Sequence, residues 1–424
     1  MPVLDKLILV GGKRLEGTVQ ISGSKNAVLP IMAASLLADG TYTFGNVPRL
    51  RDVRTMQKLI ENMGISVTLD GHTLRIYSQP CEHCEAPYDQ VKTMRASIYV
   101  LGPLVGRFGR ARVSLPGGCA WGPRPVNLHI DGLTRLGAKI HFEKGYIVAS
   151  ARRLKGARVS FDIPSVGATG NILMACVLAR GTTVIENAAR EPEITALAGF
   201  LNRMGARIEG IGTSRLEIEG VDELHPADTD VIPDRIETGT FLAASHLTGG
   251  DVTLEKTSPA LVNSILDKLR IAGAEITETD EQIRIKSDRS IRPVDVTTSV
   301  YPGFPTDMQA QWMALMSIAD GSSVITDTIY SDRFTHVAEL RRLGANITLD
   351  HNVAVVKGVR TLSGAPVMST DLRASASLIL AGLVAKGRTD VSRVYHIDRG
   401  YETIEKKLQM LGAEIWREQE KLVV

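Results

Sequence analysis

The 424-residue sequence has few cysteines, almost no net charge and no long apolar run. Its four cysteines are too few for a disulfide framework and are typical of a reducing cytosol. The 49 Lys and Arg against 47 Asp and Glu leave a net charge of +2, which predicts no binding to nucleic acid or to a membrane surface. The apolar run 7–10 is too short for a signal peptide, and 27–38 falls short of a bilayer span. We therefore expect a cytoplasmic protein whose anion sites come from local clusters of charge.

Motifs for nucleotide and metal cofactors are missing as well. Gly23-Ser24-Lys25 resembles the end of a Walker A motif, but Gly17 is one residue too far away and Asn26 follows the lysine. No G-x-G-x-x-G follows an expected strand. Cys81-Glu82-His83-Cys84 resembles half a zinc site, without a second Cys or His pair at suitable spacing. The sequence thus predicts no cofactor and no metal.

What the sequence does contain is a sixfold repeat. Six times a helical pattern ends at a glycine and turns into an alternating segment, and successive glycine positions differ by 73, 68, 68, 71 and 68 residues. These glycines are Gly64, Gly137, Gly205, Gly273, Gly344 and Gly412. In each repeat an apolar helix comes first, and a helix with one charged face follows. We expect each repeat to form a strand, a buried helix, a strand, an outer helix and two strands.

Six such repeats predict an α/β protein of two similar halves with three repeats each. A polar stretch near residues 220–234, which contains Pro226 and Pro233, is the expected hinge between the halves. Two halves joined by a hinge leave a cleft, and ligands often bind in such clefts. We therefore expect the functional site between the halves.

The starts of the apolar helices are where the repeats differ from one another. A helix start exposes free N–H groups and a partial positive charge, which together attract anions. Several of these starts also carry cations, among them Lys25, Arg95 and Arg373. A cleft lined in this way suits a substrate with phosphate and carboxylate groups. The alternative is that Ser24, Thr306 and Asp371 are ordinary N-caps, which does not explain a cation at the positive end of a helix.

The most irregular segment is 115–125, in which three glycines and three prolines surround Cys119. This composition is expected to present the thiol, and nearby Arg124 favours the thiolate. Cys176, within an apolar helix, is expected in the core. A cysteine hydrolase with His129 as the base is disfavoured, because the sequence around Cys119 lacks the flanking signatures of such enzymes. A general-acid or covalent role toward an anionic substrate fits better.

Five motifs, in order along the whole chain, closely resemble the family of UDP-N-acetylglucosamine enolpyruvyl transferases. They are Lys25-Asn26, the segment from Cys119 to His129, 305–311, 371–375 and 395–401. The resemblance implies an inside-out α/β barrel in two domains, built from six β-α-β-α-β-β units. One domain would be 25–232 and the other 1–24 plus 233–424, with hinges near 22–25 and 220–234.

The resemblance also implies a reaction. The enolpyruvyl group of phosphoenolpyruvate would move to the 3-hydroxyl of UDP-N-acetylglucosamine through a tetrahedral intermediate, with release of phosphate. This is the first committed step of bacterial peptidoglycan synthesis. Both expected partners are small molecules, no protein partner is predicted, and guanidinium groups would neutralise charge without a metal.

Residue roles follow from the resemblance by motif. Cys119 would protonate the alkene and can attach covalently to phosphoenolpyruvate, Asp307 would take the hydroxyl proton, and Asp371 would assist proton transfer. Lys25 and Arg399 would also be catalytic. The residues expected to bind phosphoenolpyruvate are Lys25, Asn26, Arg124, Arg333, Arg373 and Arg399. Those expected to bind the sugar nucleotide are Asn26, Arg95, Arg124, Pro125, Val126, Asn127, Leu128, Ser165, Val166, Gly167, Asp307 and Ile329.

Three positions depart from the family pattern. Many members carry Asp at Asn127 and Glu at Gly170, and some carry a diphosphate-binding Lys at Ile163. Without that lysine the diphosphate would depend more on Arg124 and on the helix start at Ser165. The nearest alternative is the sister enzyme that acts on shikimate 3-phosphate, which lacks the Cys loop. From another class, a catalytically silent anion-binding repeat protein remains the alternative.

Overall fold

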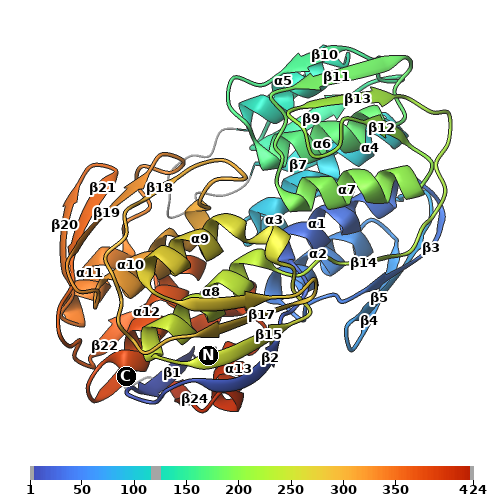
Figure 1. Ribbon diagram of the computed structural model, residues 1–424. Helices are drawn as coiled ribbons and strands as arrows, with labels where there is room; N and C mark the ends of the chain where they lie inside the picture. Colours follow the sequence, from blue (N-terminus) through green and yellow to red (C-terminus); the bar gives the residue numbers. More distant parts are fainter. Residues whose placement is uncertain (1–3, 116–125, 421–424) are drawn as a thin grey trace. The chain divides into compact units, whose positions relative to one another are not determined.

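The computed structural model describes residues 4–115 and 126–420, which form two compact units with separate hydrophobic cores (Figure 1). The first, which we call the continuous unit, is Gly23–Ile232. The second, the split unit, combines Met1–Ser22 with Pro233–Val424. Each unit holds three of the six four-stranded sheets described by the structure.

The continuous unit contains the first three sheets, with inner helices that follow the expected apolar segments. In spatial order the sheets are β14 (Thr229–Asp230), β3 (Gly40–Gly45), β5 (Thr73–Ser78) and β4 (Ser66–Asp70); β6 (Glu85–Ala86), β7 (Arg110–Ser114), β9 (Tyr146–Ser150) and β8 (Lys139–Glu143); and β10 (Arg158–Ser160), β11 (Thr182–Glu186), β13 (Arg215–Glu219) and β12 (Arg207–Glu209). The inner helices are α1 (Lys25–Ala34) with η1 (Ser35–Leu37), η2 (Arg95–Val100) with α4 (Leu101–Phe108), and α6 (Val166–Cys176). The remaining helices are α2 (Arg51–Glu61), α3 (Tyr88–Val91), α5 (Asn127–Arg135) and α7 (Pro192–Arg203).

The split unit repeats this arrangement. Its sheets are β2 (Glu16–Gln20), β15 (Asp251–Glu255), β17 (Gln282–Lys286) and β16 (Glu275–Glu278); β18 (Val296–Thr298), β19 (Ser322–Asp327), β21 (Val353–Lys357) and β20 (Asn346–Asp350); and β22 (Pro366–Met368), β23 (Arg388–Ser392), β1 (Leu4–Val10) and β24 (Glu414–Glu420). Its inner helices are α8 (Arg235–Thr248), η4 (Thr306–Met308) with α10 (Gln309–Met316), and α12 (Leu372–Val384). The remaining helices are η3 (Pro259–Leu261), α9 (Asn263–Ala272), α11 (His336–Arg342), η5 (Val394–Arg399) and α13 (Ile404–Met410).

The inner helices form the middle of each unit, which confirms the expected inside-out α/β fold. In the split unit α8, α10 and α12 contact one another, and every residue of α10 and α12 is buried. Most positions around these helices are apolar, so their burial removes a large apolar area from water. The polar residues that they carry, such as Gln311 in α10 and Arg373 in α12, are buried with them. Two of the six inner segments differ from expectation, because they begin with a 3-10 turn, η2 and η4.

The six repeat glycines confirm the sixfold architecture. Each has a positive φ, from 86° at Gly64 to 111° at Gly273. A left-handed residue ends a helix by turning the chain away from its axis, and glycine adopts this conformation without steric cost. The same turn therefore closes the second helix of each repeat and begins the strand that follows.

The sheets are not built from contiguous repeats, although the repeat pattern alone predicted that they would be. All six share one plan, in which the first two strands are parallel and the other pairs antiparallel. However, β1 lies between β23 and β24, β2 pairs with β15, and β14 pairs with β3. The first repeat thus takes its edge strand from residues 229–230, and the sixth is completed by residues 4–10.

The chain crosses between the units twice, after Ser22 and after Ile232. Backbone hydrogen bonds join the two crossing segments to each other. The Ser24 N–H donates to the Ile232 carbonyl at 2.7 Å, and the Asp234 N–H donates to the Ser22 carbonyl at 2.9 Å. The expected hinges at 22–25 and 220–234 contain both points.

The cysteines differ from the expectation of free thiols. Cys81 and Cys84 form a disulfide with each other, which takes up both sulfurs of the half zinc motif. Cys176 lies fully buried in α6, as predicted, and burial raises its pKa to about 12. Among residues 4–115 and 126–420, no helix combines the length and apolarity needed to cross a membrane.

Candidate active site

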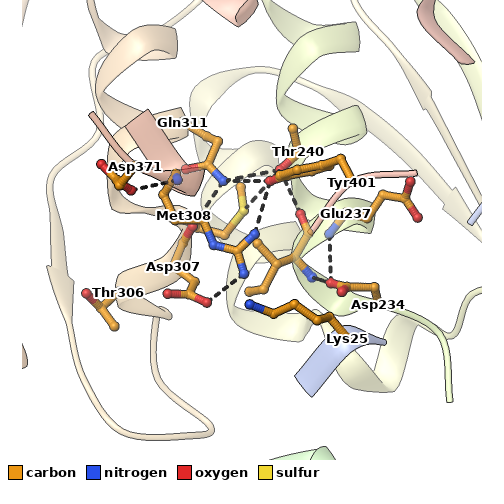
Figure 2. A network of polar contacts seen from close by, with 12 residues as sticks. Lys25, Asp234, Glu237, Thr240, Thr306, Asp307, Met308, Gln311, Asp371 and Tyr401 are labelled. Carbon is orange, nitrogen blue, oxygen red and sulfur yellow. Dashed lines mark hydrogen bonds and ion pairs between the residues drawn. The ribbon is translucent and has the colours of Figure 1, made fainter. Parts of the chain in front are cut away.

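In the split unit the Asp307 carboxylate lies between the guanidinium groups of Arg333 and Arg373. Figure 2 labels Asp307 and several of the residues around it. Asp307, in η4, accepts from Arg333 Nη2 at 2.8 Å through Oδ1 and from Arg373 Nη2 at 2.7 Å through Oδ2. The two arginine side chains are almost fully buried, whereas the Asp307 side chain is 26% exposed. The structure therefore brings together three of the residues expected at the site.

The charges of this triad are strongly coupled. Burial acts to raise the pKa of Asp307, but Arg373 and Arg333 outweigh it and hold that pKa well below its usual range. Burial acts to lower the pKa of Arg373, and Asp307 more than offsets it, so this pKa is raised. Two guanidinium groups against one carboxylate leave one net positive charge. The triad can bind an anion, while Asp307 in this state is a weak base.

The start of α12 positions Arg373. Asp371 Oδ1 accepts from the backbone N–H of Arg373 at 2.8 Å and of Ala374 at 3.2 Å, which is an N-cap. The N-cap alternative is thus correct for Asp371 and wrong for Ser24, whose side chain makes no cap bond. Two further caps, Asp234 and Ser165, were not predicted from the sequence.

Asp327, which the sequence analysis missed, supports the other arginine. It is fully buried at the end of β19, and its Oδ2 accepts from the Thr306 hydroxyl at 2.7 Å. The Thr306 oxygen accepts from Arg333 Nη1 at 3.0 Å. Asp327 Oδ1 accepts from the backbone N–H of Ile329 at 2.9 Å, so it also fixes an expected sugar-nucleotide residue. The one signal in the sequence was a carboxylate directly after an apolar strand.

Arg399 is the last residue of η5 and is half-buried. Its neighbour Asp398 accepts from Arg417 Nη1 at 3.0 Å and from Nη2 at 2.6 Å. This bidentate pair joins η5 to β24 and restrains the position of Arg399.

In the continuous unit, Lys25 is the first residue of α1, where a cation opposes the helix dipole. Its Nζ lies 3.6 Å from Oδ2 of Asp52, a buried carboxylate in the first turn of α2. Asp52, which sequence reasoning did not identify, thus compensates the charge of Lys25. Asn26 follows in α1, and half-buried Arg95 begins η2.

Asn171, in the middle of α6, holds this helix against α5, η2 and α4. Its Nδ2 donates to the Ile98 carbonyl at 2.8 Å and lies 3.0 Å from His129 Nδ1, while its Oδ1 accepts from the Gly102 N–H. Since both backbone partners fix the orientation of the amide, His129 Nδ1 accepts, and the ring proton is on Nε2. Burial, aided by Arg95, lowers the pKa of His129 to about 4, so the ring is neutral at physiological pH.

The remaining expected residues of this unit lie at two helix starts. Ser165 caps α6 by accepting from the Ala168 N–H at 3.3 Å, and Val166 and Gly167 are the first two helical residues. A Cβ on Gly167 would lie 3.3 Å from the His129 ring. The start of α5 contains Val126, Asn127 and Leu128, whereas Cys119, Arg124 and Pro125 lie outside the described residues.

The structure shows the surroundings of two of the three positions that depart from the family pattern, Gly170 and Ile163. A Cβ on Gly170 would lie 2.9 Å from the Tyr99 ring and 3.3 Å from Ile194 and Leu197, so the space for a larger side chain is filled. Ile163 is 62% exposed just before α6. Within the described residues, no three His, Cys, Asp or Glu side chains gather as metal ligands.

Comparisons with known proteins identify the family that the chain resembles along its length. The family model described as EPSP synthase (3-phosphoshikimate 1-carboxyvinyltransferase) matches residues 9–408. The chain is 57% identical to a UDP-N-acetylglucosamine 1-carboxyvinyltransferase from Myxococcus xanthus, covering 98% of this chain and 100% of the relative. It is 58% identical to the protein of that name from Chloroherpeton thalassium, covering 98% and 97%.

Solved structures show the same fold. The crystal structure of the enolpyruvyl transferase NikO from Streptomyces tendae matches with a TM-score of 0.89 and 26% identity, covering 99% of this chain and all of the other. An EPSP synthase from Acinetobacter baumannii matches with a TM-score of 0.77 and 20% identity, covering 98% and 100%. The latter likeness is one of fold.

Proposed function

The chain belongs to the EPSP synthase family, and we propose that it transfers the enolpyruvyl group of phosphoenolpyruvate to the 3-hydroxyl of UDP-N-acetylglucosamine, releasing phosphate. The observation that carries this proposal is identity of 57–58% along essentially the whole chain to enzymes named for UDP-N-acetylglucosamine. The EPSP synthase structure is only 20% identical, which disfavours shikimate 3-phosphate as the acceptor. The reaction would supply bacterial peptidoglycan synthesis.

The guanidinium groups of Arg333 and Arg373 together form a binding site, which we call the anion seat, for an anionic group of phosphoenolpyruvate. In the structure the Asp307 carboxylate pairs with both guanidinium groups and so occupies that seat. When the substrate's anion takes over the guanidinium groups, Asp307 loses the charges that depress its pKa and becomes a stronger base. It then accepts the proton of the sugar hydroxyl, whose oxygen forms a bond to C2 of phosphoenolpyruvate. Substrate binding itself thus activates the base.

The proton that completes the addition goes to the CH2 carbon of phosphoenolpyruvate. Cys119 is the proposed donor. Elimination then breaks the bond from C2 to the phosphate oxygen while one proton of the new methyl carbon returns to the Cys119 thiolate, which restores the alkene. Lys25, Arg124 and Arg399 neutralise the phosphate of phosphoenolpyruvate. Arg124 and the α6 start at Ser165 bind the diphosphate of the sugar nucleotide, to which Arg95 also binds. The cap at Ser165 and the Lys25–Asp52 pair support this assignment, because both set the charge at a helix start.

Phosphate release from phosphoenolpyruvate tests the function. We expect rapid release with UDP-N-acetylglucosamine and none above background with shikimate 3-phosphate, measured under identical conditions. Activity with shikimate 3-phosphate alone would replace the proposal by the sister reaction. Activity with neither would favour the silent anion-binding protein.

Asp371 allows a separate test of catalytic and structural roles. Asp371→Asn keeps an oxygen that can cap α12, so we expect its unfolding free energy to fall by less than about 1 kcal/mol. If Asp371 assists proton transfer, kcat falls at least about 100-fold in this stable variant. Asp371→Ala should lose about 1–2 kcal/mol of stability as well. Full activity of Asp371→Asn would show that Asp371 only caps α12 and has no part in proton transfer.

A further inference from the structure

A buried polar cluster of Thr240, Gln311 and Tyr401, all labelled in Figure 2, contacts Arg373 through the Tyr401 hydroxyl. The Tyr401 hydroxyl lies 3.3 Å from Arg373 Nη1, 3.2 Å from Gln311 Nε2 and 2.8 Å from Thr240 Oγ1. Gln311 is fully buried, and Thr240 and Tyr401 are each 1% exposed. The cluster joins α8, α10 and α12 to the residues after η5.

The chemistry of the groups fixes the direction of each hydrogen bond. A guanidinium nitrogen only donates, so the Tyr401 oxygen accepts from Arg373. Gln311 Nε2 also only donates, and its two protons are shared among the Asp307 carbonyl at 3.0 Å and the Thr240 and Tyr401 oxygens at 3.2 Å each. The phenol proton must then go to Thr240, whose own hydroxyl donates to the Ile236 carbonyl at 2.7 Å. The chain of donors therefore runs from Arg373 through Tyr401 and Thr240 to a backbone carbonyl.

This chain of hydrogen bonds fixes which nitrogen of the Arg373 guanidinium faces the Asp307 carboxylate. Nη1 is held on the inner side by Tyr401, while Nη2 is left to face the Asp307 carboxylate. Burial raises the pKa of Tyr401, so the phenol stays neutral and protonated beside the cation. A planar guanidinium fixed at one nitrogen cannot rotate the other away from the anion seat.

We propose that Tyr401 is a positioning residue, which orients Arg373 so that its second nitrogen faces phosphoenolpyruvate. The inference rests on the proposed function, because it assigns that substrate to the seat. Tyr401 contacts the arginine and not the reacting atoms, so it acts on substrate binding through Arg373. Loss of the hydroxyl removes the acceptor of Nη1 and frees the guanidinium to turn.

Tyr401→Phe is the test. We expect the KM for phosphoenolpyruvate to rise about tenfold, equivalent to about 1.4 kcal/mol, while the KM for UDP-N-acetylglucosamine changes less than about twofold. The matched control is Tyr42→Phe, which removes a buried hydroxyl that donates to the Ala38 carbonyl at 3.0 Å in the continuous unit. This control should leave both Michaelis constants unchanged. Unchanged constants in folded Tyr401→Phe, or equal rises in both, would overturn the proposal.

Thr240 provides a second pair of variants if Tyr401→Phe does not fold. Thr240→Val removes the acceptor of the phenol proton with little change of shape, and Thr240→Ser restores a hydroxyl. We expect the phosphoenolpyruvate KM to rise in the first and to return toward the wild-type value in the second. The same KM in both variants would contradict the chain of donors.

A readout without turnover separates this inference from the proposed function. We expect phenylglyoxal to modify Arg373 several-fold faster in substrate-free Tyr401→Phe than in wild type, as located by peptide mass spectrometry. The Tyr42→Phe rate should equal the wild-type rate. Faster labelling in a protein inactive toward UDP-N-acetylglucosamine would reject the function and keep the restraint on Arg373; equal labelling would reject the restraint.

Discussion

Replacing Asp307 with Asn is expected to lower kcat by about 100- to 10,000-fold and, at the same time, to strengthen phosphoenolpyruvate binding. The first effect follows from loss of the base. The second follows because the carboxylate competes with the substrate for Arg333 and Arg373 in the free protein. We expect the dissociation constant, measured by calorimetry with UDP-N-acetylglucosamine present, to fall about tenfold, or about 1.4 kcal/mol.

Asp251→Asn is the matched control for Asp307→Asn. Asp251 pairs with Arg284 through two bonds of 2.9 Å on the surface of the same unit, so its loss removes an Asp–Arg pair away from the triad. We expect its kcat and its affinity for phosphoenolpyruvate to match wild type. Weaker phosphoenolpyruvate binding by Asp307→Asn would refute the idea that the carboxylate occupies the seat.

Ionised Asp307 is expected to stabilise the folded protein at neutral pH and to lose this effect in acid. Because its pKa is depressed in the folded state, its contribution to stability is present above the unfolded value of about 3.9 and is lost as the pH falls toward the folded value. The difference in unfolding free energy between wild type and Asp307→Asn should thus be constant from about pH 6 to 8 and shrink only below about pH 4.

We expect a small epoxide phosphonate such as fosfomycin to alkylate Cys119 and to abolish turnover. The other three cysteines are protected by their surroundings. Cys81 and Cys84 are bonded to each other, and the pKa of buried Cys176 is raised to about 12, so little thiolate forms there. The modified residue is identified by mass spectrometry of the digested protein after incubation with the reagent.

Cys119→Ser separates the two proposed roles of the thiol. The variant should not react with the epoxide, and its kcat should fall at least about 100-fold, because a hydroxyl is a far weaker acid than a thiol. Cys176→Ser serves as the control and should be alkylated at the wild-type rate. Label found on Cys81, Cys84 or Cys176 would contradict the assignment of Cys119.

The sequence predicted the local features of this fold well. The glycine that ends the second helix of each repeat and the apolar helix earlier in the repeat are set by neighbouring residues, and the structure contains both in all six repeats. The helix starts expected at Lys25, Arg95 and Arg373 agree within one residue with the starts of α1, η2 and α12. The repeat pattern did not predict that β1, β2 and β14 join the sheets of repeats distant in sequence, because a strand's sequence does not specify its partner.

The supporting residues of the site could not be found in the same way. Thr240 and Tyr401 are 161 residues apart, and Lys25 pairs with Asp52 on another helix. Nothing local distinguishes a buried Tyr that holds an arginine from one that fills the core, as Tyr42 does. The motif residues Asp307, Arg333 and Arg373 were predicted as a set by resemblance, and their mutual ion pairs became visible only in the folded unit.

The placement of β1 between β23 and β24 has a consequence for synthesis on the ribosome. Residues 23–232 carry every strand of their own three sheets, so that unit can fold as soon as it emerges. Residues 4–10 are made first but meet their partners only after residue 414. At about 5–20 residues per second, this apolar segment waits roughly 10 to 40 seconds longer than the continuous unit needs. It is the part of the nascent chain that we expect chaperones to shield.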